Sequence, residues 1–116
     1  MSYSISLNDS DGAPVKVPPH TEGSIIQLGG CSSANFDVTY NYSRYYYQTL
    51  CADRGIRKLS GMKAADAIPL LEVAIQVLGT EQSGDYWEVT PGNAGHALNV
   101  MLEWAKRYPD ATFEVY

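Results

Sequence analysis

The alternation of apolar and polar residues along the chain predicts several short strands. Residues 3–7, Tyr-Ser-Ile-Ser-Leu, alternate strictly, as in a strand with one buried face. The alternation returns at residues 35–42, where one face would carry Phe36, Val38, Tyr40 and Tyr42. Short apolar runs predict two further strands, at residues 24–28 and 111–116. These segments predict a small antiparallel or mixed sheet.

Residues 8–23 separate the first two predicted strands. They begin with the turn-forming run Asn-Asp-Ser-Asp-Gly and contain three prolines, Pro14, Pro18 and Pro19. Because proline has no amide hydrogen to give to a neighbouring strand, we expect an irregular, extended connection without regular pairing at the prolines.

Apolar residues recur at helical spacing in three segments, residues 44–54, 62–78 and 91–108. Ser43 is a suitable N-cap for the first helix and Gly55 a suitable end for it. The third helix has a typical start at residues 90–91, where a capping threonine precedes a proline.

The second helix is the most apolar of the three. Val73 and Val77 are expected beside its buried face, and Gly79 is expected to end it. Pro69 lies inside this segment, so we predict a kink or a restart near Asp66. Strands at both ends of the chain with helices between them favour an α+β fold, in which helices cover a short sheet in one domain, residues 1–116.

Composition and charge limit the classes of partner. The chain has 116 residues, of which 45% are hydrophobic and 18% charged, and its formal net charge is -5. Such a negative charge opposes direct nucleic-acid binding, which needs a basic surface. The sequence contains neither a long apolar run nor a signal peptide, so we expect a cytoplasmic protein without a membrane span.

Strong catalytic and metal-binding motifs are absent from the sequence. There is no Gly-x-Ser-x-Gly, no phosphate-binding loop and no closely spaced pair of metal ligands. We therefore predict no catalytic residue, no metal and no cofactor, and an enzyme is the less favoured class. An alternative remains, in which His20 or His96 acts with a nearby carboxylate in a small hydrolase or transferase.

Five tyrosines lie between positions 40 and 47. The strand and helix phases place Tyr40, Tyr42, Tyr46 and Tyr47 inward and leave Tyr45 as the most exposed of the five. Asn41 can either fix the backbone at this junction or offer a donor and an acceptor to a ligand.

A second cluster lies at the start of the third helix. It combines Tyr86 and Trp87 with Gly92 and Asn93, and His96 follows on the polar flank of that helix. A helix N-terminus can hold an anion or a polar group. The alternative is a capped loop whose aromatic side chains fasten it to the core.

Two motifs occur together in the chain, Thr-Tyr-Asn-Tyr-Ser at residues 39–43 and Tyr-Trp-x-x-Thr-x-Gly-Asn-Ala at residues 86–94. With these motifs the chain resembles a family of small uncharacterised proteins from bacteria, phages and prophages. Many members carry Thr-His-Asn where this chain has Thr-Tyr-Asn, so chemistry by that histidine would not extend to Tyr40. The resemblance implies a phage or mobile-element setting and no particular activity.

Three hypotheses follow. The first is a non-enzymatic protein that binds a small polar or nucleotide-like ligand, or a host protein, and counteracts host defence. The second is the small hydrolase or transferase, and the third is a structural protein that forms homo-oligomers through its tyrosines. The candidate ligand- or partner-binding residues are Thr39, Tyr40, Asn41, Tyr42, Ser43, Tyr86, Trp87, Gly92, Asn93 and His96.

Overall fold

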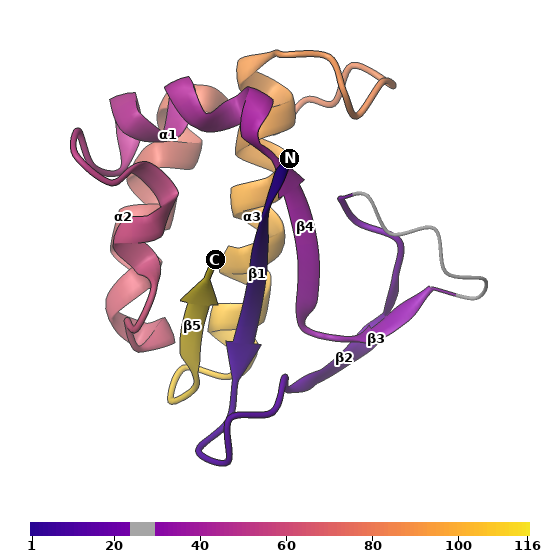
Figure 1. The fold of residues 1–116 in the computed structure, drawn as a ribbon, viewed down its shortest axis with the longest axis vertical. Coiled ribbons are helices and arrows are strands. Elements are labelled where there is room, and N and C mark those ends of the chain that lie inside the picture. The colour runs from indigo at the N-terminus through magenta and orange to yellow at the C-terminus, as the bar shows by residue number, and fades with distance from the viewer. Residues whose placement is uncertain (24–29) are drawn as a thin grey trace.

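The main sheet has three antiparallel strands in the order β4-β1-β5, which lie in front of helix α3 (Pro91–Arg107) in Figure 1. The computed structural model describes residues 1–23 and 30–116. Strand β1 (Ser2–Asn8) lies between β4 (Asn35–Thr39) and β5 (Thr112–Val115), and Ile5 pairs with Phe36 on one side and with Val115 on the other. The predicted strands at 3–7 and 111–116 are confirmed, whereas the one at 24–28 lies outside the described residues.

A second, two-stranded sheet pairs β2 (Lys16–His20) with β3 (Cys31–Ser33). The prediction of an irregular connection over residues 8–23 was therefore wrong for its second half. Val15 and Val17 are buried, and their burial favours an extended segment here. The two prolines of β2 lie between the paired residues Lys16 and His20, where the register is irregular. Their missing amide hydrogens therefore remove no hydrogen bond from the pairing of β2 with β3.

The strand predicted at 35–42 ends three residues early. Residues Tyr40–Tyr42 form a short 3₁₀ helix, and the hydroxyl of Thr39 accepts a hydrogen bond from the amide of Asn41. This cap ends the strand, although the apolar alternation continues in the sequence. Ser43 is the first residue of helix α1 rather than its N-cap.

Helix α1 (Ser43–Thr49) is also shorter than predicted. Gly55 does not end it but opens a second 3₁₀ helix, Gly55–Leu59. The expected exposure of two tyrosines is reversed. Tyr47 is exposed and its ring lies over Gly55, whereas Tyr45 is half-buried against the core. Tyr42 and Tyr46 are buried as predicted.

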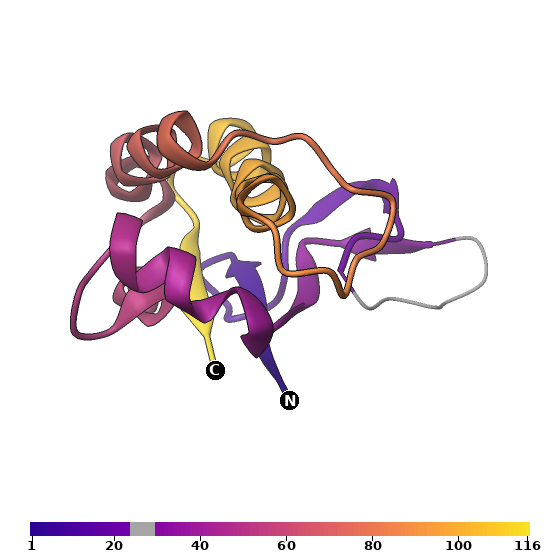
Figure 2. The same ribbon diagram turned by 90° about the horizontal axis from the view of Figure 1, so that it is seen from above.

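Helices α2 (Ala64–Leu78) and α3 (Pro91–Arg107) lie side by side over one face of the main sheet (Figure 2). Helix α2 continues through Pro69 without a restart and ends at Gly79. Val73 and Val77 are exposed, contrary to prediction, because the buried stripe of α2 runs along Ala67, Leu71, Ala74 and Leu78.

The start of α3 is formed as predicted, since the Thr90 hydroxyl accepts from the amide of Asn93 and Pro91 is the first helical residue. The core between helices and sheet contains Ile5, Leu7, Tyr42, Tyr46, Leu98, Met101 and Phe113. In the part of the chain that the structure describes, no helix has the length and apolar character required to cross a membrane.

Candidate functional site

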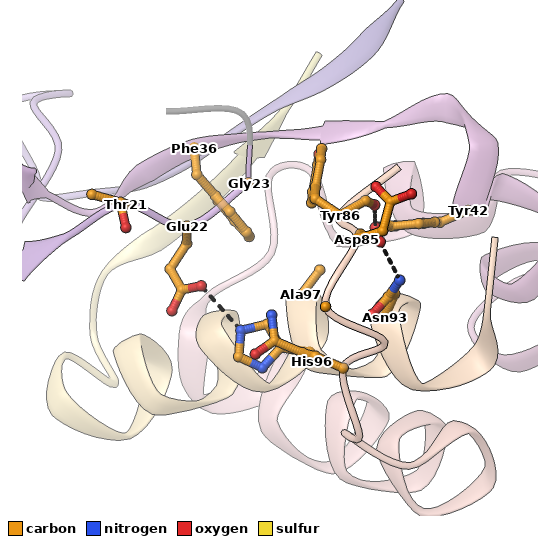
Figure 3. A pocket seen from close by; sticks show the side chains of 12 residues that line it. Thr21, Glu22, Gly23, Phe36, Tyr42, Asp85, Tyr86, Asn93, His96 and Ala97 are labelled. Carbon is orange, nitrogen blue, oxygen red and sulfur yellow. Dashed lines mark hydrogen bonds and ion pairs between the residues drawn. The ribbon is translucent and has the colours of Figure 1, made fainter. Parts of the chain in front are cut away.

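A cavity of about 240 Å³ lies between α3, the loop that precedes it and the segment that follows β2 (Figure 3). Polar and apolar side chains both line it. The lining residues are Thr21, Glu22, Gly23, Phe36, Tyr42, Gln82, Gly84, Asp85, Tyr86, Asn93, His96 and Ala97.

Two glycines of α3 allow the preceding segment to lie directly on the helix. A Cβ atom on Gly95 would come within 1.7 Å of the carbonyl oxygen of Gly79, and one on Gly92 within 2.0 Å of the carbonyl oxygen of Glu81. No larger residue fits at either position without moving backbone. Gly92 thus has a packing role at the helix N-terminus, and the backbone of Glu81 lies across it.

Asn93 fixes the loop that forms one wall of the cavity. Its side chain is buried, and its Oδ1 accepts from the amide of Ser83 at 3.0 Å. Its amide group lies 3.0 Å from Ser83 Oγ and from the Asp85 carbonyl, and 2.9 Å from the Glu88 carbonyl. A side-chain amide with this many partners inside the protein is a structural anchor.

Tyr86 fastens the same loop to the main sheet. Its hydroxyl donates to the carbonyl of Asp37 at 3.0 Å and accepts from the amide of Thr39 at 2.8 Å, so it covers the free edge of β4. The hydroxyl of Tyr42 donates to the carbonyl of Tyr86. Burial raises the pKa of both tyrosine hydroxyls, which keeps them protonated and able to donate.

His96 and Glu22 form a hydrogen bond at the cavity, with Nε2 of the imidazole 3.0 Å from Oε1 of the carboxylate. The hydrogen bond from His96 lowers the pKa of the Glu22 carboxyl below its usual value. An ionised carboxylate only accepts, so the proton of this bond belongs to Nε2 of His96. Both side chains are partly exposed and lie at one end of the cavity (Figure 3).

His20 lies outside the cavity and is held by its neighbours. Its Nε2 lies 2.9 Å from the carbonyl of Ser33, and its Nδ1 accepts from the amide of Glu22 at 3.2 Å. Its ring also packs against that of Trp104, 5.3 Å away. With both ring nitrogens held by backbone groups and its ring against Trp104, His20 serves as a link between β2, β3 and α3.

The candidate residues from the sequence are divided between the cavity and its surroundings. Four of them line the cavity, namely Tyr42, Tyr86, Asn93 and His96. Asn41 is exposed on the 3₁₀ helix and does not line it, so the structure does not bring Asn41 and Asn93 together. Trp87 is 56% exposed and packs edge-on against Tyr86.

The other candidates have structural contacts. Thr39 is buried and caps the 3₁₀ helix, and Ser43 begins α1. The hydroxyl of Tyr40 accepts from Arg57 at 3.2 Å, and its ring packs against Tyr3.

Sequence reasoning missed several lining residues. Asp85 adjoins the Tyr86-Trp87 motif and could have been included for that reason. Glu22, Phe36 and Gln82 belong to segments far apart in the chain, and no local pattern links them. Among the residues that the structure describes, no group of three or more potential ligand side chains could hold a metal ion.

Comparison of the chain with models of protein families, with curated proteins and with solved structures finds no match. A proposal for the function therefore rests on the cavity and the residues that line it.

Proposed function

We propose that this chain is a binding protein that holds a small polar ligand in the cavity beside α3. The observation that carries this proposal is a hollow whose walls are already fixed by the protein's own hydrogen bonds, chiefly those of Asn93 and Tyr86. Ligand sites are commonly preformed in this way. The volume of about 240 Å³ is below the ~300 to 1,000 Å³ typical of drug-sized ligands, which favours a compact ligand.

The polar groups in the walls favour binding over catalysis. Tyr42, Tyr86 and Asn93 use their hydroxyl and amide groups on backbone partners. Groups committed in this way fix the shape of the cavity and are not free to transfer protons to a ligand.

One contact supports a second candidate, a small hydrolase or transferase. His96 lies 3.0 Å from Glu22 at the cavity, and a histidine oriented by a carboxylate is the usual arrangement of a general base. His20 gives this candidate less support, because both of its ring nitrogens have structural partners. Turnover of a bound compound that is lost in His96→Gln, with binding retained, would favour the enzyme.

The resemblance to phage and prophage proteins suggests that the binding function operates in an infected or lysogenic host cell. In that setting the protein would withhold a small signal from the host or occupy a host protein. The exposed side chains of Trp87 and Val89, in the loop before α3, support the second version, since exposed aromatic residues often anchor protein interfaces.

Ligand-dependent thermal stabilisation tests the proposal. We expect one or more compounds from a panel of small amines, amino acids, nucleosides and nucleotides to raise the melting temperature, because a ligand at 100 times its Kd adds about 2.7 kcal/mol to the unfolding free energy. Ala97 lines the cavity, so Ala97→Met should fill it and abolish the shift.

The matched control is Ala65→Met, which adds the same side chain at an exposed position of α2. It should keep the ligand-induced shift. A panel that produces no shift, or a shift that survives in Ala97→Met, would refute binding at this cavity.

A further inference from the structure

We infer that the ligand of this cavity is a small organic cation, such as a primary alkylammonium, rather than a phosphorylated compound. The inference rests on the proposed function and concerns the chemical class that the same site accepts. The described residues that line the cavity include two carboxylates, Glu22 and Asp85, and no lysine or arginine.

The hydrogen-bond donors of the cavity are largely used by the protein itself. The hydroxyls of Tyr42 and Tyr86 donate to backbone carbonyls, and the amide group of Asn93 faces Ser83, Asp85 and Glu88. Nε2 of His96 donates to Glu22. The remaining side-chain donors, on Thr21 and Gln82, belong to exposed residues, as does the carboxylate of Asp85.

Acceptor capacity, in contrast, is left over. Oε1 of Glu22 receives the bond from His96, and Oδ1 of Asp85 receives one from the amide of Trp87 at 3.0 Å. Each carboxylate has a second oxygen and further lone pairs. A site with spare acceptors and few donors satisfies a donor-rich ligand. The oxygens of a phosphate would meet two carboxylates and no lysine or arginine, and the His96 ring already donates its Nε2 proton to Glu22.

The side chains between the two carboxylates favour a ligand with an apolar part. In Figure 3 Glu22 lies at one end of the cavity and Asp85 toward the other, with Phe36 and Ala97 between them. The rings of Phe36, Tyr42 and Tyr86 line the same space, and aromatic rings attract cations as well as alkyl groups. A short alkyl body with an ammonium end matches this arrangement.

A set of three probes of equal length tests the inference, namely n-butylammonium, n-butanol and butyrate. Each is titrated into the full chain, and the amide resonances of Gly84, Asn93 and Ala97 are followed by NMR. We expect n-butylammonium to bind about tenfold more tightly than n-butanol and butyrate not to bind. Raising the salt concentration from about 10 to 150 mM should weaken the binding of n-butylammonium but not that of n-butanol, since charge screening increases over this range.

Two variants test whether the two carboxylates cause the tighter binding of n-butylammonium. Glu22→Gln and Asp85→Asn each keep a side-chain oxygen for the existing hydrogen bond and remove one negative charge, so each should weaken n-butylammonium several-fold and leave n-butanol unchanged. Glu72→Gln makes the same charge change at an exposed position of α2 and should alter neither. Amide spectra of the variants establish that they are folded.

The outcomes separate this inference from the function on which it rests. Equal binding of the three probes, or tighter binding of butyrate, overturns the cation assignment and leaves a ligand-binding cavity. If none of the three shifts the cavity resonances, the cation assignment also fails, and the compound panel with Ala97→Met decides the proposed function separately.

Discussion

At the scale of single residues, Asn93 has the clearest structural role near the cavity. Its side chain is 5% exposed and joins the first turn of α3 to three residues of the preceding loop. Removing such an amide leaves backbone groups without partners in a place that water reaches poorly, which costs more than the bonds themselves contribute.

We therefore expect Asn93→Ala to lower the free energy of unfolding by about 1 to 3 kcal/mol, measured by urea denaturation. Asn99→Ala is the control, because Asn99 lies on the same helix and its side chain makes no hydrogen bond within the described residues. It should change the unfolding free energy by less than about 0.5 kcal/mol. Similar losses in both variants would contradict the anchoring role.

At the scale of elements, the N-terminal half of α3 and the segment after α2 form one packed unit. Gly95 is buried, and the carbonyl of Gly79 occupies the place of its missing side chain. This close approach sets the distance between α3 and the segment that follows α2.

Gly95→Ala tests the unit because two effects of known sign oppose each other. Alanine is favoured over glycine inside a helix by about 1 kcal/mol, but its Cβ would come within 1.7 Å of the Gly79 oxygen. We expect the clash to dominate and the unfolding free energy to fall by about 1 to 3 kcal/mol, as measured by chemical denaturation. A stabilised variant would show that the segment moves aside at no cost.

At the scale of the whole molecule, the loop before α3 connects the helical layer to the edge of the main sheet. Tyr86 makes this connection at β4, while residues 61–63 pair with β5 at the opposite edge. Uncovered strand edges promote association between chains, and these contacts leave less edge backbone of the main sheet free to pair with another strand.

Tyr86→Phe removes only the hydroxyl that bridges Asp37 and Thr39. The amide of the buried Thr39 would lose its partner, and we expect the unfolding free energy to fall by about 1 to 3 kcal/mol. Light scattering after size exclusion should also detect more association than in the wild type. Tyr47→Phe, at an exposed ring, should change neither property. An unchanged Tyr86→Phe would mean that the hydroxyl does not protect the edge.

Prediction from sequence succeeded where the signal is local. Strict alternation located β1, and the Thr90-Pro91 pair located the start of α3. It failed at residues 40–42, where the alternation continues but the Thr39 cap ends the strand, and at Tyr45 and Tyr47, whose exposure depends on what packs above α1.

The amino-acid sequence by itself determined the fold class, the main elements and the motif that contains Tyr86 and Asn93. Tertiary structure decided the site, because its walls come from segments far apart in the chain. Glu22 and His96 are 74 positions apart, and Phe36 reaches the same cavity from β4. Periodicity and capping depend on neighbours within a few residues, whereas a cavity depends on how complete elements pack.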